Sequence, residues 1–396
     1  MIKDSYDVIV VGAGPGGSAA SKALAELGHS VLLLEKRQEI GSPKRCAEGL
    51  SEATAEIFGH IPQNCISAPI KGARVFAPNG ESVTVDFGAN STGVVVERKM
   101  FDKWLAGEAS RKGAKVIADA EVTGIIEDGE YVTGVRASFN GGKEKEIKAK
   151  VVVAADGVET TIARKAGMDT HNKPVNVDSG FQYEMCNLKM EDTKKIYLFL
   201  GNDVAPRGYI WIFPKGKDTA NVGIGVSGAE RTAKEYLDDF IESRPEIFSE
   251  SGIVEVNSGG IPVGGFLDNM VKDGLVIVGD AGHQVNPIHG GGIKEATLAG
   301  RMAADVISKC IKNDDVSAEA LSEYNRIWWK ERGESLKRVE KLRTVMEKLS
   351  DGDMNMLAEN LDGEIIVELT RGNKLKNLAK IMMKRPSLLR LARHLL

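Results

Sequence analysis

A strand, a glycine-rich loop and a helix follow one another at the start of the chain, and this order constrains the fold most. Residues 6–11 (YDVIVV) form an apolar, β-branched run that is typical of a buried parallel strand. The next residues satisfy the GxGxxG pattern and precede a helical pattern of alanines and leucines: Gly12-Ala13-Gly14-Pro15-Gly16-Gly17. Residues 30–34 are a second apolar run, which ends at Glu35. Together these features predict a Rossmann-type unit that binds a dinucleotide.

The glycines and the acid of this unit have physical reasons to be there. Gly12 permits the tight turn, Gly14 lets the backbone approach a pyrophosphate, and Gly17 permits close packing of helix on strand. The helix N-terminus offers free N–H groups to phosphates, and Glu35 can accept from both ribose hydroxyls. The alternative is a glycine-rich turn without a ligand, which the coincidence of strand, loop, helix and acid disfavours. We also assign to the site Ala13, Pro15, Gly16 and Lys36.

Two segments far along the chain indicate which dinucleotide binds. Residues 151–157 are a strand ending in Asp156-Gly157, and residues 273–283 contain a strand ending in Gly279-Asp280, followed by a glycine-rich turn and a helix. Asp280 can accept from a ribityl hydroxyl. The reduced flavin edge N1–C2=O is negative and can face the amides of Gly291, Gly292 and Ile293 at the helix start. The alternative is a plain strand-ending turn, but beside a dinucleotide fingerprint these segments predict non-covalently bound FAD.

The order of the three segments resembles the FAD-dependent group that includes para-hydroxybenzoate hydroxylase. Residues 205–214 (APRGYIWIFP) match the PxxYxWxFP signature of geranylgeranyl reductases, and residues 42–49 (SPKRCAEG) resemble the cysteine-containing loop of that family. The likeness spans nearly the whole chain and is greatest to archaeal digeranylgeranylglycerophospholipid reductases. It implies an enzyme that saturates C=C bonds of geranylgeranyl chains in membrane ether phospholipids, with hydride from reduced flavin N5 and a separate proton.

The resemblance also implies further cofactor contacts. Arg98 would hold FAD at a helix start, and Val122 would lie on the strand that brackets the adenine. The cysteine loop would contribute Arg45, Cys46, Ala47 and Gly49. The chain departs from the hydroxylase pattern at Thr160 and Arg164, which disfavours a hydroxylase-like NADPH contact.

Three residues are the candidates for catalysis: Cys46, Tyr209 and Trp211. Tyr209, Trp211 and Phe213 alternate along a strand, so they share one sheet face, either as an aromatic wall of an isoprenoid channel or as ordinary sheet core. Cys46 follows two cations, which favours a reactive thiol, although a small residue in a cofactor loop is an equal alternative.

The C-terminal segment is basic. Residues 371–396 hold eight Lys and Arg and no acid, with apolar residues at helical spacing. We expect amphipathic docking on an anionic lipid surface, with Arg371 or Lys374 near a phospholipid headgroup. A solvated helix packed on the domain is the alternative.

We expect an α/β fold with an α+β insert: a Rossmann-type FAD-binding domain, a β-rich substrate domain and a helical C-terminal segment. The FAD-binding domain is expected over residues 1–70, 95–170 and 270–340. An antiparallel substrate-binding domain is expected over 171–270 together with 71–94, and a helical, basic region over 341–396.

Composition excludes several classes of protein. A net charge of −4 gives no general attraction to nucleic acid, and four cysteines without a CxxC pair predict neither metal site nor disulfides. The cysteine usage fits a reducing compartment, so we expect a cytoplasmic protein, peripheral at the inner membrane face. No apolar run is long enough for a membrane span. The expected partners are an isoprenoid lipid or phospholipid and an external electron donor, namely NAD(P)H, ferredoxin or F420. The rival functions are a monooxygenase of the same fold and a non-catalytic prenyl-lipid carrier.

Overall fold

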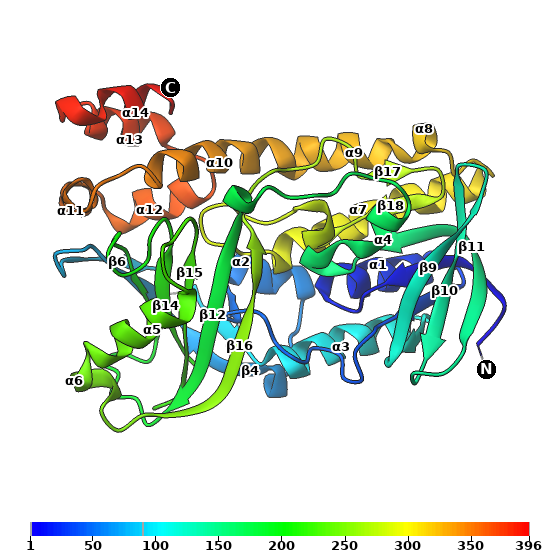
Figure 1. Cartoon of the computed structure of the whole chain (residues 1–396), viewed down its shortest axis with the longest axis horizontal. Helices are drawn as coiled ribbons and strands as arrows, with labels where there is room; N and C mark the ends of the chain where they lie inside the picture. The colour runs from blue at the N-terminus through cyan, green and yellow to red at the C-terminus, as the bar shows by residue number, and fades with distance from the viewer. Residues whose placement is uncertain (1, 89–90, 396) are drawn as a thin grey trace.

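The computed structural model describes residues 2–88 and 91–395 and shows an elongated molecule with a sheet at each end (Figure 1). The strands of the first sheet are β1 Ser5–Val11, β2 Val31–Leu34, β8 Lys115–Ile117, β9 Ala120–Asp128, β10 Tyr131–Phe139, β11 Glu144–Ala154, β17 Val271–Lys272 and β18 Leu275–Ile277. They run in the order β17-β18-β11-β1-β2-β8, and the hairpin β9–β10 is attached to β11. Strands β18, β11, β1, β2 and β8 are parallel, so their carboxyl ends meet at one edge.

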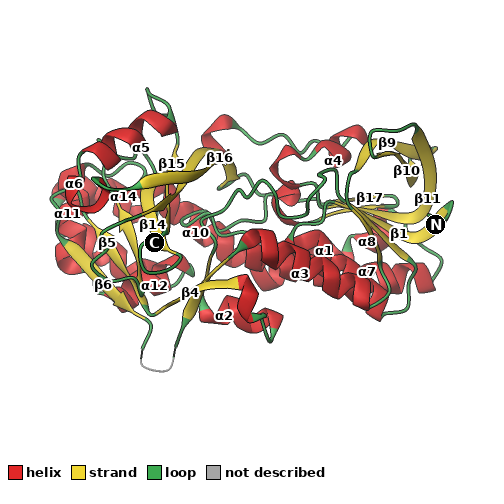
Figure 2. Ribbon diagram, turned by 90° about the horizontal axis from the view of Figure 1, so that it is seen from below, coloured by secondary structure: helices red, strands yellow, loops and turns green. Residues whose placement is uncertain are grey.

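Three helices cover this parallel sheet: α1 Pro15–Glu26, α3 Arg98–Arg111 and α7 Ile293–Lys312. Helix α1 packs against both α3 and α7. The three helices lie in the middle of the molecule (Figure 2). Close approach depends on glycine, because a Cβ on Gly300 would lie 2.4 Å from the carbonyl oxygen of Gly16. The apolar runs of β1 and β11 are buried between these layers, as expected of parallel strands.

Short elements connect the two large sheets. A three-stranded sheet holds β3 Gly49–Leu50, β4 Ile66–Ile70 and β7 Gly93–Val96 in the order β3-β7-β4. The short helices are α2 Glu52–Ala55 and α4 Thr161–Lys165. This small sheet positions residues 44–49 between the first sheet and the second.

The second sheet has seven strands: β5 Gly72–Phe76, β6 Ser82–Asp86, β12 Val177–Cys186, β13 Lys195–Phe199, β14 Tyr209–Pro214, β15 Ala220–Val226 and β16 Gly252–Pro262. Their order is β16-β12-β15-β14-β13-β5-β6. All neighbours are antiparallel except β13 and β5, which run parallel. The expected antiparallel sheet thus has one parallel pair, because β5 enters from a distant segment of the chain rather than through a hairpin.

The two faces of the second sheet differ in character. On the outer face, Ile210, Ile212, Val222 and Ile224 join an apolar core that is covered by α5 Ala233–Glu242 and α6 Pro245–Phe248. On the inner face, toward the first sheet, strand β12 presents Asp178, Gly180, Gln182 and Glu184. Cross-strand neighbours on this inner face include Gly223, Gly225 and Gly259, so the floor is polar and has little side-chain bulk.

Helices form the C-terminal part: α8 Ala318–Leu321, α9 Glu323–Trp328, α10 Glu334–Met346, α11 Asp351–Asn360, α12 Gly363–Thr370, α13 Leu375–Met382 and α14 Leu389–Arg393. A π-helical turn over 329–333 joins α9 to α10. The expected boundary between residues 340 and 341 falls inside α10, which is continuous because Leu336, Val339, Leu342 and Val345 bury one face. Among the described helices, none combines the length and apolarity needed to cross a bilayer.

Candidate FAD and substrate site

The predicted cofactor segments converge at the carboxyl edge of the parallel sheet. Gly12 has a φ of 104°, and a Cβ there would lie 2.3 Å from the carbonyl oxygen of Ala155, so the two strand-ending loops touch. A Cβ on Gly17 would lie 1.9 Å from the carbonyl oxygen of Gly12. In contrast, a Cβ on Gly14 would meet no protein atom within 4 Å, which leaves open space in front of the start of α1, where Pro15 is the first residue. This arrangement fits a phosphate at a helix N-terminus.

Glu35 lies at the end of β2 and is engaged with the backbone. Its carboxylate accepts from the N–H of Ala13 at 2.9 Å and from the N–H of Arg37 at 3.0 Å. Beside it, Lys36 and Arg45 both pair with Glu159, at 2.6 and 3.0 Å. A groove of about 600 Å³ follows, lined by Lys36, Arg37, Gln38, Glu39, Ser42, Asp119 and Glu121.

Val122 lies next to this groove, but its side chain is buried in the core of the first sheet. The resemblance places the adenine against the backbone of this strand. Of the residues of β9, Glu121 lines the groove.

Asp156 has one carboxylate oxygen in use and one free. Oδ2 accepts from the hydroxyl of Thr161 and the N–H of Ile162, both at 3.0 Å. Oδ1 is buried and has no partner among the described residues. Gly157 follows with open space at its Cβ position. A buried acceptor without a donor fits a ligand that supplies one.

Asp280 lies between Arg98 and the glycine-rich turn. A Cβ on Gly292 would lie 2.9 Å from its Oδ1, so only glycine leaves this carboxylate room. Burial raises the pKa of Asp280, and nearby Arg98 and His283 oppose that rise. The turn itself begins at Gly279, whose φ is 71°. Asp280 has no hydrogen bond from any described side chain, which fits acceptance from a cofactor hydroxyl.

The start of α7 presents the amides that were predicted to face the flavin edge. Gly292 is the N-cap and Ile293 the first helical residue. The N–H of Gly291 donates to Nδ1 of His289 at 3.0 Å. The structure therefore leaves Gly292 and Ile293, rather than Gly291, with amides available at this helix start.

Cys46 lies where the cysteine loop meets Arg98. Its Sγ accepts from the N–H of Glu48 at 3.2 Å. Burial alone would lower the pKa of Arg98, but Asp102 and then the Cys46 sulfur outweigh burial and raise it. The guanidinium of Arg98 forks onto Asp102 at 2.8 and 2.7 Å. The sulfur thus accepts one backbone hydrogen bond and lies close to the Arg98 guanidinium.

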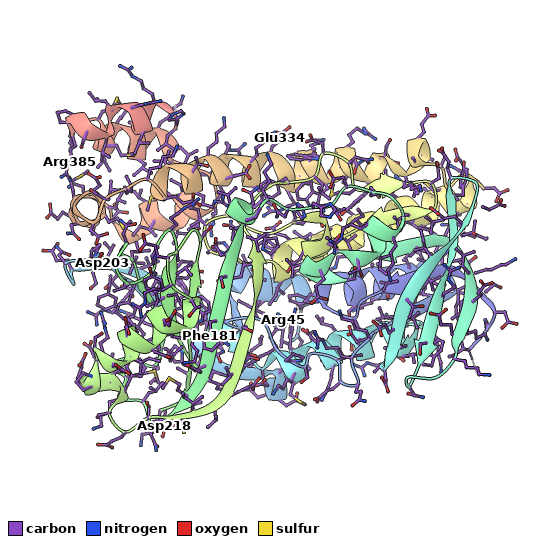
Figure 3. The ribbon with its side chains drawn as sticks, viewed as in Figure 1. Arg45, Phe181, Asp203, Asp218, Glu334 and Arg385 are labelled. Carbon is purple, nitrogen blue, oxygen red and sulfur yellow. The ribbon has the colours of Figure 1, made fainter. Side chains whose placement is uncertain are left out.

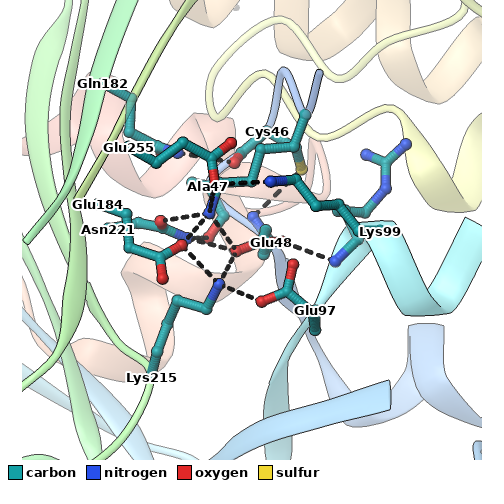
Figure 4. A network of polar contacts seen from close by, with 12 residues as sticks. Cys46, Ala47, Glu48, Glu97, Lys99, Gln182, Glu184, Lys215, Asn221 and Glu255 are labelled. Atoms are coloured by element: carbon teal, nitrogen blue, oxygen red, sulfur yellow. Dashed lines mark hydrogen bonds and ion pairs between the residues drawn. The ribbon is translucent and has the colours of Figure 1, made fainter. Parts of the chain in front are cut away.

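A buried network of ion pairs fixes this loop to the second sheet (Figure 4). Lys44 contacts Glu184 on β12 and lies 3.4 Å from Glu48. Asn221 on β15 donates to the Glu48 carboxylate at 2.7 Å and to the carbonyl of Ala47 at 3.2 Å. The side chains of Lys44 and Glu48 are fully buried, so the network replaces their lost hydration.

Lys215 occupies the centre of three carboxylates in this network. Its Nζ lies 2.8 Å from Glu48, 2.6 Å from Glu97 and 2.9 Å from Glu184. The three acids lie close enough to hold a metal ion, but the ammonium of Lys215 already provides the positive charge. Sequence reasoning missed this cluster because its members come from four distant segments. The alternation of Asp178, Gly180, Gln182 and Glu184 on β12 was the available signal.

The aromatic strand is hydrogen-bonded to both cofactor loops. The Tyr209 hydroxyl donates to the carbonyl of His289 at 2.8 Å. The Trp211 indole donates to Gln182 at 2.9 Å, and Gln182 donates to the carbonyl of Cys46 at 3.1 Å. Tyr209 and Trp211 pack edge to face with ring centroids 5.8 Å apart. The wall is therefore held in register with the loops on either side of it.

The remaining predicted residues lie at the margins of this site. The ring of Phe213 lies against Gly49, where a Cβ would be 2.5 Å away. Arg45 lies beside β16 (Figure 3), and a Cβ on Gly259 would be 3.1 Å from its Cδ. Arg371 and Lys374 lie in the link between α12 and α13 and pair with Glu368 at 2.8 Å and Glu364 at 2.6 Å.

The fold and site define an FAD-dependent oxidoreductase. Residues 7–172 match the FAD dependent oxidoreductase family, and residues 176–261 match the geranylgeranyl reductase catalytic domain. The fold also matches a geranylgeranyl bacteriochlorophyll reductase-like protein from Thermoplasma acidophilum, with a TM-score of 0.90, 33% identity, and coverage of 99% of this chain and 100% of that one. A flavin-dependent brominase at 19% identity and a TM-score of 0.76 shares the fold.

Curated relatives identify the family. The chain is 45% identical to the digeranylgeranylglycerophospholipid reductase of Methanocaldococcus jannaschii, over 100% of this chain and 99% of that protein. It is 42% identical to the enzyme of that name from Methanocella arvoryzae, over 98% of both chains. The chain belongs to the digeranylgeranylglycerophospholipid reductase family. The predicted family, fold class, FAD cofactor and class of enzyme are thereby confirmed.

Proposed function

We propose that this protein saturates C=C bonds of geranylgeranyl chains in archaeal-type ether phospholipids. The observation that carries the proposal is the aromatic wall of Tyr209 and Trp211, which is hydrogen-bonded to both loops of the cofactor site. An apolar chain laid along this wall lies beside the redox centre while remaining shielded from water. Because an isolated alkene has no carbonyl to polarise, positioning supplies much of the catalysis.

When bound, FAD supplies hydride transfer from its reduced form. The space in front of Gly14 would receive the cofactor. The free Oδ1 of Asp156 and the unbonded carboxylate of Asp280 would accept hydrogen bonds from it. The chain contributes the remaining work: Tyr209, Trp211 and Phe213 orient the substrate, and the ion-pair network keeps the Cys46 loop in place.

Cys46 is proposed as a catalytic residue on the cofactor side of the wall. Its sulfur accepts from the N–H of Glu48 and faces the Arg98 guanidinium, so it is placed to respond to charge in the site. A thiol in such surroundings is suited to redox or proton handling.

Lys294 indicates where a phosphate headgroup would lie. Burial lowers its pKa, and repulsion from Arg332 and Arg371 lowers it further. Lys294 has no ion pair among the described residues, and Thr370, beside Arg371, accepts from Asn286 of the glycine-rich turn at 2.9 Å. We propose that Lys294 and Arg371 receive the headgroup, with Lys374 nearer the surface.

The last two helices are proposed to rest on an anionic lipid surface. Lys376, Lys380, Lys384, Arg390 and Arg393 are exposed, as are the apolar side chains of Met383 and Leu389. Flotation with anionic vesicles should therefore carry the protein upward. A variant that combines Lys376→Gln, Lys380→Gln and Lys384→Gln should stay with the soluble fraction. The control variant that combines Lys143→Gln, Lys148→Gln and Lys217→Gln should float like the wild type. Equal flotation of both variants would contradict the docking.

The decisive test of function is anaerobic. Protein reduced with dithionite is given unsaturated digeranylgeranylglycerol phospholipid, and the lipid mass is followed. Stepwise gain of hydrogen pairs with flavin reoxidation supports the proposal. Unchanged lipid without oxygen, with an added oxygen atom in air and NAD(P)H, would instead establish a monooxygenase. Substituting NAD(P)H, ferredoxin or F420 for dithionite then identifies the external electron donor.

A further inference from the structure

Asp178 is a carboxylic acid on the inner face of the second sheet, at the end remote from the ion-pair network. It lies near the start of β12 and pairs in register with Ile261 on β16. Its carboxylate has no hydrogen bond or ion pair with any residue that the structure describes. A partly buried acid without a partner is uncommon, because burial without compensation is costly.

Asp178 points into a hollow left by glycine. The position that a Cβ on Gly225 would occupy lies 3.9 Å from Oδ2 of Asp178. The same point lies 3.8 Å from the Trp211 ring and 3.7 Å from Cδ1 of Ile261. One carboxylate oxygen therefore shares this space with the aromatic wall and an aliphatic side chain.

The hollow adjoins the glycine-rich turn of the cofactor site. Ile261 touches this turn from one side, since a Cβ on Gly290 would lie 3.1 Å from its Cγ2. Tyr209 touches it from the other side through the carbonyl of His289. A substrate lying on Trp211 would thus have the cofactor loop on one side and Asp178 within reach on the other.

We propose that Asp178 is the general acid that delivers the proton to the alkene, and this role rests on the proposed reductase function. Saturation of one C=C bond requires a hydride and a proton. One carbon would take the hydride from the reduced cofactor, and the cofactor would thereby be oxidised. The π electron pair forms the second C–H bond with the proton of the Asp178 carboxyl, and the resulting carboxylate takes a proton from water before the next cycle.

The charges around Asp178 suit this task. Burial raises the pKa of Asp178 to about 6. Arg343 on α10 and Arg207 act to lower this pKa, and Glu347 acts to raise it. Arg207 and Arg343 are both occupied by Glu347. Tyr209 on β14 also lies near Asp178, and burial raises the pKa of its phenol further from neutrality. Near neutral pH, the protonated and ionised forms of Asp178 are therefore both populated, as general acid catalysis requires.

Cys46 is the alternative proton donor, and its position differs from that of Asp178. Its sulfur accepts from the N–H of Glu48 and lies near Arg98, on the side of the cysteine loop. Asp178 and Cys46 are reached from different sides, because Gln182 and Trp211 lie between the cysteine loop and the hollow. Variants at the two positions can therefore be told apart.

The experiment compares Asp178→Asn with Asp178→Glu, Cys46→Ser and the exposed control Asp218→Asn, which lies in the turn after β14 (Figure 3). Each FAD-loaded, dithionite-reduced protein is mixed without oxygen with digeranylgeranylglycerol phospholipid, and flavin reoxidation is followed across pH 5 to about 8. We expect the wild-type rate constant to fall above the pKa of the acid. Asp178→Asn should lower it by about 10²–10⁴-fold and abolish the pH dependence. Asp178→Glu should restore both in part, and ferricyanide should reoxidise all variants alike.

A second readout needs no turnover. The infrared carbonyl band of a protonated acid, taken as wild type minus Asp178→Asn, should titrate with a midpoint near 6 in the cofactor-free protein. If the wild type reduces the lipid and Asp178→Asn does so with the same rate and pH profile, the role of Asp178 is overturned and the reductase function is not. Loss of the pH dependence in Cys46→Ser alone would transfer the role to Cys46. A wild type that reduces no lipid would overturn the proposed function and the role together.

Discussion

Glu184 and Asp178 lie six residues apart on the same strand and face the same way, yet their surroundings are opposite. Burial would raise the pKa of Glu184, but Lys215 and Lys44 outweigh it and lower that pKa. Burial raises the pKa of Asp178 to about 6, and no cation is bonded to it. The first acid is held ionised by partners and fastens the cysteine loop. The second can change its protonation state, and the difference suggests that one end of the sheet is structural and the other chemical.

The strongest test of the structural end is Lys215→Met. The substitution leaves Glu48, Glu97 and Glu184 together without the ammonium that all three share, and breaking a buried ion pair from one side costs about 3–5 kcal/mol. Urea denaturation should show this loss in the free energy of unfolding. Lys217→Met, in the exposed turn two residues on, is the matched control and should change little. A near-neutral Lys215→Met would mean that the network is solvated and does not fasten the loop.

At the chemical end, Asp178→Asn should make the protein more stable at neutral pH. The carboxyl pKa is raised from 3.8 to about 6 by folding, so the wild type is most stable while Asp178 is protonated and loses stability as the pH rises through 6. An amide does not titrate. The free energy of unfolding of the variant should therefore exceed that of wild type by about 2–3 kcal/mol above pH 7 and by little below about pH 4.

Unfolding measured in urea at a series of pH values checks this sign. Asp218→Asn should follow the wild-type curve throughout. A variant that is less stable than wild type above pH 7 would show that Asp178 is a structural acid like Glu184, and the contrast between the two ends of β12 would disappear.

Two glycines on β15 test whether the space beside Asp178 holds the substrate or is needed for packing. A Cβ on Gly223 would lie 2.4 Å from the Trp211 ring, whereas a Cβ on Gly225 meets nothing closer than 3.7 Å. Gly223→Ala should displace the indole and cost about 1–3 kcal/mol, as overpacking does. Gly225→Ala should leave stability within about 0.5 kcal/mol of wild type but slow lipid reduction, because the methyl group fills the hollow beside Asp178. Thermal unfolding and turnover measured together test the pair, and equal turnover in wild type and Gly225→Ala would place the substrate elsewhere.

The sequence predicted the cofactor half of the molecule better than the substrate half, for a physical reason. Gly12 and Asp156 follow the ends of parallel strands and Gly17 lies in the first turn of α1, so local spacing dictates their positions. The buried network instead depends on Glu48, Glu97 and Glu184 meeting through three-dimensional packing, which no spacing along the chain records. The paired strands β5 and β13 were likewise set by a long crossover rather than by a turn.

Asp178 shows where local pattern was available but insufficient. Its alternation with Gly180, Gln182 and Glu184 marks a polar sheet face. The alternation does not say which acid finds a lysine, because Lys44 and Lys215 arrive from distant loops at one end only. Likewise the C-terminal cations were visible, but the pairing of Arg371 with Glu368 and of Lys374 with Glu364 depended on how α12 and α13 turn.

The smallest effect on the free energy of unfolding is expected for an ion pair that is exposed to solvent. Lys36 and Glu159 are 2.6 Å apart, closer than most pairs of the buried network, but their side chains are 46% and 38% exposed. The pKa of Glu159 is lowered to about 2, first by Lys36, yet solvent screening prevents that shift from becoming stability, and Arg45 still pairs with Glu159 after Lys36 is removed. Lys36→Met should therefore cost at most about 0.5 kcal/mol in the cofactor-free protein, and the cost should shrink further in high salt. Lys143→Met, in an exposed hairpin turn, is the control for losing a surface charge. A loss comparable to that of Lys215→Met would show that distance rather than burial governs these pairs, and the distinction between a fastening network and a surface pair would fail.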